Sequence, residues 1–155
     1  MQAVDDRLLA AIHVAMRASP AKGRAAVAQL RPHVVDPNFI ALLDGGERWL
    51  RGDAKGASDA WRSVLHTLYE PYIDTEAFIR VGAFEAAKEL DEKDLERFHL
   101  FGGVGRRNVR AARHAAARGD MKRARELARE IIDAWSRADM EIPAITEMRA
   151  ILAKP

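Results

Sequence analysis

The sequence predicts an all-α protein, a right-handed α-solenoid of about four helix pairs closed by one further helix. Apolar residues recur at the i, i+3, i+4, i+7 and i+8 positions of a helix in the stretches that follow Gly52 and Gly119. Aromatic residues make up only 6% of the 155 residues. Alanine supplies much of the apolar content, and this composition suits closely packed helices better than a β-sandwich.

Helix boundaries follow from capping residues and prolines. Ser19-Pro20 and Asp36-Pro37 each place a capping side chain before a proline at the first helical position, and Pro143 is expected to start the last helix. Asp74 or Thr75 caps another helix, and Asp91 is expected to cap a shorter one. We expect helices over residues 5–17, 20–30, 37–51, 53–68, 75–90, 91–101, 106–118, 121–135 and 143–153.

Two Gly-Asp pairs indicate corners between antiparallel helices. A glycine can close the preceding helix, and the aspartate at Asp53 or Asp120 can cap the next one. Apolar residues lie at the same offsets after the two corners. They are Ala57, Ala60, Trp61, Val64 and Leu65 after the first, and Ala124, Leu127, Ala128, Ile131 and Ile132 after the second. Gly45-Gly46 lies inside an expected helix, where close helix–helix approach explains it; the alternative is backbone approach by a ligand.

The small and apolar residues that follow Ser19 fall at the same offsets as those that follow Asp53. The distance from Ser19 to Asp53 resembles the repeat length of the tetratricopeptide-repeat family. The resemblance is carried by Gly52–Leu65 and Gly119–Ile132, and more weakly by residues 4–31. It implies one helical-repeat domain over 1–155. Its expected units are about 4–31, 37–68, 74–101 and 105–137, with a cap at 143–153 that covers the helix of Leu127 and Ile131.

The segment from Trp135 to Pro143 is similar to the end of tetratricopeptide regions in bacterial multidomain proteins, including some serine/threonine kinases. That likeness implies that the chain is the C-terminal region of a larger bacterial signalling protein. A complete small scaffold protein is the alternative. We expect a cytoplasmic location, because no apolar run is long enough to span a membrane and the N-terminus lacks a secretory signal.

No motif predicts catalysis. The chain has no cysteine, and its 5 histidines lack metal-ligand spacing. Gly102 to Arg107 lacks the ending of a phosphate loop, and Asp91, Glu92, Asp94 and Glu96 crowd an expected helix N-terminus, where the macrodipole favours negative charge. We therefore expect a non-enzyme with no cofactor and no metal.

The strongest electrostatic feature is a basic run over residues 106–129. In the tetratricopeptide family the first helix of each pair lines a concave groove, and the resemblance implies that Arg80, Arg106, Arg110 and Arg113 face it. Arg106 and Arg110 have the one-turn spacing of the family's carboxylate clamps. Phe84 and Val109 are expected to supply apolar contact area beside them.

The predicted function is a protein-interaction module that binds an acidic or C-terminal peptide segment. Three alternatives stay open: a solvated basic face with no ligand, a nucleic-acid-binding repeat domain, and a self-associating scaffold. Nucleic acid is disfavoured, because no aromatic residue lies between Arg106 and Arg129 to stack bases. We expect reversal of Arg110 and Arg113 to glutamate to abolish peptide capture with little effect on the melting temperature.

Overall fold

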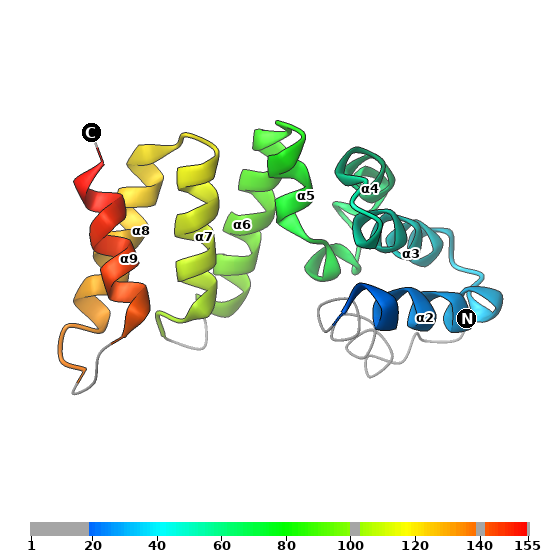
Figure 1. Cartoon of the computed structure of the whole chain (residues 1–155), viewed down its shortest axis with the longest axis horizontal. Coiled ribbons are helices and arrows are strands. Elements are labelled where there is room, and N and C mark those ends of the chain that lie inside the picture. The colour runs from blue at the N-terminus through cyan, green and yellow to red at the C-terminus, as the bar shows by residue number, and fades with distance from the viewer. Residues whose placement is uncertain (1–18, 100–102, 139–141, 155) are drawn as a thin grey trace. The chain divides into compact units, whose positions relative to one another are not determined.

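A computed structural model describes residues 19–99, 103–138 and 142–154. Of these residues, 77% are helical and none forms a strand, so the predicted all-α class is confirmed (Figure 1). The chain divides after Val81 into two compact units, which we describe separately. The first expected helix, residues 5–17, lies outside the described residues.

The described part of the first unit holds four α-helices and three short 3₁₀ helices. Side chains of Ser19, Asp36, Asp53 and Asp74 each accept a hydrogen bond from a backbone N–H of the following helix, as their capping role predicts. The elements are α2 (Pro20–Leu30), η1 (Arg31–His33), α3 (Pro37–Leu50), α4 (Ala54–Trp61), η2 (Arg62–Val64), η3 (Glu70–Tyr72) and α5 (Thr75–Arg80).

Close approach of α3 and α4 explains the glycine at Gly45. Trp61 of α4 is fully buried, and its indole N–H donates to the carbonyl of Leu42 on α3 at 3.0 Å. A Cβ atom on Gly45 would overlap the indole ring of Trp61. The prediction of close helix packing is therefore confirmed at this position, where a side chain would exclude the tryptophan.

The expected helix 53–68 is too long. The α-helix ends at Trp61, η2 extends it to Val64, and Leu68 is 69% exposed. The turn brings Tyr69 back to the start of α3, where its ring stacks on Phe39 with centroids 5.3 Å apart and its hydroxyl donates to Asp36 at 2.6 Å. Burial and this hydrogen bond raise the pKa of Tyr69 to about 12.

The described part of the second unit consists of α6 (Phe84–His99), α7 (Arg106–Ala117), α8 (Met121–Ala134) and α9 (Pro143–Ala153). The expected break at Asp91 is wrong, because Asp91 lies inside α6 and is only 4% exposed. The chain instead turns between α5 and α6 at Gly82, whose φ of +73° favours glycine. Val81 and Phe84 flank this turn at 37% and 41% exposure.

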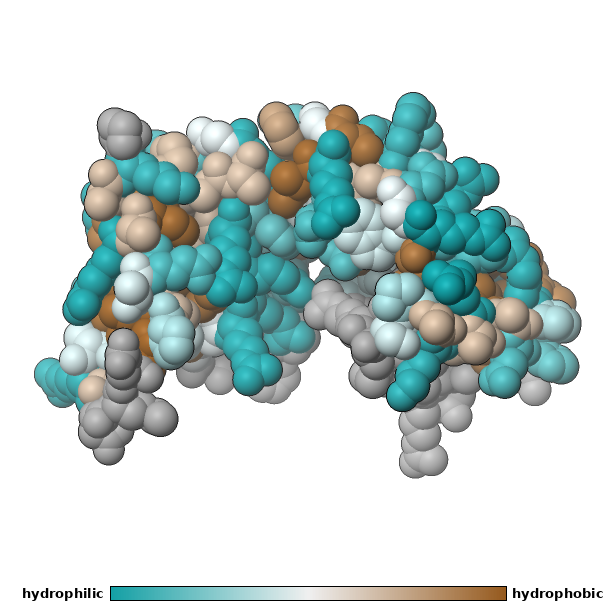
Figure 2. Space-filling model, in the orientation of Figure 1, coloured by the Kyte–Doolittle hydropathy of each residue, from teal (hydrophilic) through white to brown (hydrophobic). Residues whose placement is uncertain are grey.

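Alanine and larger apolar residues of α7, α8 and α9 share one core. Ala112 and Ala115 of α7 pack with Leu127 and Ile131 of α8, and α9 contributes Met148 and Ile151 to the same cluster. The expected packing of residues 143–153 against the helix of Leu127 is thus confirmed. Hydrophilic residues gather over α6 and α7 on the face drawn in Figure 2. No helix among the described residues has the length and apolar character needed to cross a membrane.

Candidate functional site

Helix α7 carries a row of arginines on the side turned away from the core. The backbone N–H of Gly105 donates to the side chain of Asn108 at 3.0 Å, which fixes the start of the helix. Val109, Ala112 and Ala115 point into the core and leave the opposite side to charged residues. We call this side the arginine face; it consists of Arg106, Arg107, Arg110 and Arg113.

Two members of the arginine face share a carboxylate of α6. Nη2 of Arg110 lies 2.5 Å from one oxygen of Asp94, and Nε of Arg107 lies 3.4 Å from the other. The Nε of Arg110 is buried and has no hydrogen-bond partner within the described structure. The pairs with Asp94 connect α7 to α6.

Arg113 forms a bidentate ion pair with a carboxylate of α9. Its Nε and Nη2 each donate to one oxygen of Glu147 at 2.6 Å. This hydrogen-bonded pairing lowers the pKa of Glu147 and raises the pKa of Arg113. The geometry is the bidentate one in which arginine recognises carboxylates most selectively.

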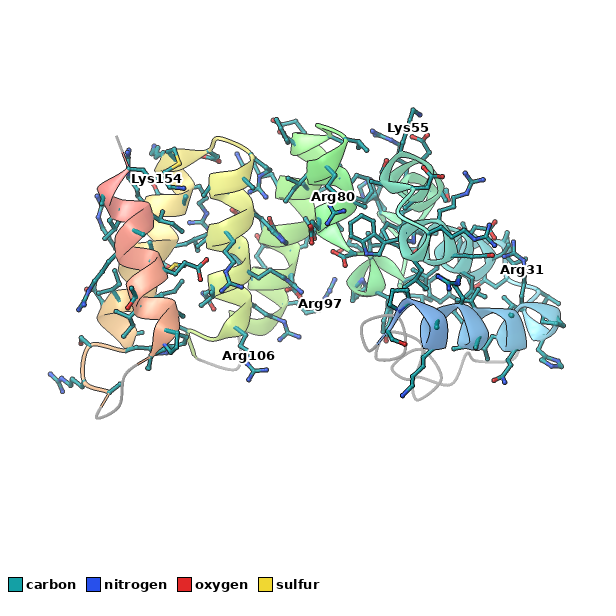
Figure 3. The ribbon with its side chains drawn as sticks, viewed as in Figure 1. Arg31, Lys55, Arg80, Arg97, Arg106 and Lys154 are labelled. Atoms are coloured by element: carbon teal, nitrogen blue, oxygen red, sulfur yellow. The ribbon has the colours of Figure 1, made fainter. Side chains whose placement is uncertain are left out.

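Arg106 begins α7 and is exposed, and it has no ion-pair partner among the residues that the structure describes. In Figure 3 its side chain extends away from the end of the helix. Its charge is therefore available to a ligand without the loss of an ion pair to any described residue.

Beside the arginine face, α6 and α7 form a buried ion-pair cluster. Asp91 accepts a hydrogen bond from Arg118, and both side chains are almost completely buried, at 3% and 4% exposure. Nδ1 of His114 lies 2.9 Å from the other oxygen of Asp91. One residue along, Glu92 binds Nε and Nη2 of Arg123 on α8, both at 2.8 Å. Much of the basic run therefore binds the acidic residues of α6.

Sequence reasoning missed these acidic partners because it placed them at a helix N-terminus. Their signal was present in the sequence: Asp91, Glu92 and Asp94 lie close together, while a run of arginines follows in the next two helices. Complementary charge on neighbouring helices indicates pairing between them.

Two other predicted site residues of the second unit, Val109 and Phe84, lie away from the arginine face. Val109 is 7% exposed and belongs to the core. Phe84 lies ten residues from Asp94 on α6, about 15 Å away at the helical rise. Arg80 belongs to the first unit, where it pairs with Glu76 at 2.6 Å and lies over the ring of Trp49 at 4.8 Å. Arg110 and Arg113 are the predicted residues that the described structure connects to carboxylates on this face, with Arg106 at its end.

A pocket of about 310 Å³ lies between α8 and α9, and none of the predicted site residues lines it. Its walls include Trp135, Ile145 and Arg149. Within the described ranges, no group of three or more His, Cys, Asp or Glu side chains is placed to hold a metal ion.

Comparison of the chain with protein-family models, with curated proteins and with solved structures finds no significant match.

Proposed function

We propose that this chain is a non-catalytic, tetratricopeptide-like helical-repeat module, an α-solenoid, that binds an acidic or C-terminal peptide segment on the arginine face of α7. Packed helices joined by glycine turns support the repeat architecture: Gly52 lies between α3 and α4 and Gly119 between α7 and α8, both with positive φ. The ligand class follows from the chemistry of the face.

The observation that carries the proposal is the exposed bidentate pair of Arg113 and Glu147, at 56% and 38% side-chain exposure. A carboxylate presented by a helix fits this part of the face with good geometry. Arg106, which has no ion-pair partner among the described residues, adds a cation at the start of the same helix. A peptide with several carboxylates can therefore contact more than one arginine, with selectivity that comes from charge and fork geometry.

The ion pairs of Arg110 and Arg113 make these residues unsuitable for a charge-reversal test of peptide binding. Arg110 and Arg113 bind Asp94 and Glu147, so reversing them to glutamate would place like charges together and disturb contacts between helices. Arg106 is the better position, because reversing it removes no contact to a described residue. Arg129 on α8 is a matched control, exposed and likewise without an ion-pair partner among the described residues.

The experiment measures fluorescence anisotropy of a short fluorescein-labelled oligoglutamate peptide titrated with each variant. Arg106→Glu should weaken binding by about three- to tenfold at low salt, whereas Arg129→Glu should have little effect. The binding should weaken as salt rises. Equal losses in the two variants would indicate non-specific charge attraction, and tighter binding of a single-stranded oligonucleotide would support the nucleic-acid alternative.

A further inference from the structure

The contact between Arg113 and Glu147 connects two helices that are 34 residues apart in the sequence. It lies at the surface, where exposed ion pairs contribute little to stability because water screens the charges and the side chains lose freedom. A ligand carboxylate can therefore replace Glu147 at Arg113 at small cost.

Helix α9 does not depend on this contact to stay in place. Met148 and Ile151 are 0% and 5% exposed and belong to the core of the second unit. At the C-terminal end of α9, Arg125 of α8 donates to the backbone carbonyl of Lys154 at 2.5 Å. Glu147 can thus release Arg113 while α9 remains packed on α8.

We infer that Glu147 is an intramolecular competitor that occupies the Arg113 position of the peptide site until a partner's glutamate displaces it. This inference rests on the proposed function of the arginine face. It also specifies the ligand further, as a segment whose carboxylate replaces that of Glu147 in the same bidentate geometry. The affinity for the peptide then depends on how much more strongly Arg113 binds the ligand carboxylate than the carboxylate of Glu147.

The test compares wild type with Glu147→Gln, using the labelled oligoglutamate peptide and the full chain. Removing the competitor should tighten binding by about two- to fivefold, the range that an exposed ion pair can supply. Glu130→Gln is the matched control, since it makes the same change of charge at an exposed position on α8. It should leave the affinity unchanged.

The same substitution in a variant that lacks Arg113 shows whether Glu147 affects peptide binding through Arg113. In an Arg113→Ala chain, adding Glu147→Gln should change the affinity no further, because the competition has lost its site. Thermal melting of each variant checks that the fold is intact.

The outcomes separate this inference from the proposed function. If Glu147→Gln binds no more tightly than wild type, or if Glu130→Gln tightens binding equally, the competition is wrong while the peptide site stands. If neither wild type nor Glu147→Gln binds the peptide, both proposals are overturned.

Discussion

Asp91 and Arg118 form a deeply buried ion pair, at 3% and 4% side-chain exposure. Asp91 also faces Nδ1 of His114 at 2.9 Å, so its two oxygens are both engaged. Removing the carboxylate would leave the guanidinium of Arg118 buried without its counter-charge. Such a loss is more damaging than the loss of a surface pair, because the remaining charge is still kept from water.

We predict that Asp91→Ala lowers the free energy of unfolding by about 3–5 kcal/mol. Urea unfolding followed by circular dichroism measures the change. Glu130→Gln, an exposed substitution, should stay within about 0.5 kcal/mol of wild type. A loss below about 1 kcal/mol for Asp91→Ala would show that the pair is not buried in solution.

The residues of the site could be predicted only in part. Arg106, Arg110 and Arg113 stand out in the sequence because they form a helical row in a basic run. Their partners could not be assigned, since Asp94 and Glu147 meet them only after the helices pack, 16 and 34 positions away along the chain. Val109 was expected to supply contact area beside the arginines, and this is wrong, because the packing of α7 places its side chain in the core.

At the scale of elements, helices with clear end signals were predicted well. α3 begins after Asp36 at a proline, and α9 begins at Pro143, as the sequence indicates. The boundary between α5 and α6 was missed because Ala83 follows Gly82 and has no side chain that could cap a helix. The sequence instead predicts a helix cap at Asp91, because aspartate is a common capping residue. In the structure its carboxylate forms an ion pair with Arg118.

The turn at Gly82 provides a test of that correction. Gly82→Ala should lower the free energy of unfolding by about 1–2 kcal/mol, because alanine is strained at positive φ. Steric overlap does not contribute, since no atom lies within 4 Å of an added Cβ. Thermal or urea unfolding measures the effect.

Gly103→Ala is the matched control for this substitution. Its added Cβ also meets no atom within 4 Å, but Gly103 is not among the glycines with positive φ. Its stability should be unchanged or slightly higher, because alanine restricts the unfolded chain. If the two variants have the same stability, the left-handed turn at Gly82 is contradicted.

At the scale of the whole molecule, the described residues form two compact units that meet in sequence at Val81 and Gly82. The second unit contains the arginine face, its acidic partners and the α9 helix that supplies Glu147. The proposed peptide site therefore needs only contacts within this unit. Charges on the first unit, such as Arg80 with its own partner Glu76, are not required for it.

The measurement that tests the central claim most directly is an NMR titration of the full chain with the oligoglutamate peptide, observing the arginine Nε–H signals. We predict that the signals of Arg106, Arg110 and Arg113 shift together and that the shifts disappear at high salt. The Nε of Arg110, for which the described residues offer no hydrogen-bond partner, should be among them. Shifts that instead centre on Lys122 and Arg129 of α8, or no shifts at any peptide concentration, would contradict a peptide site on α7.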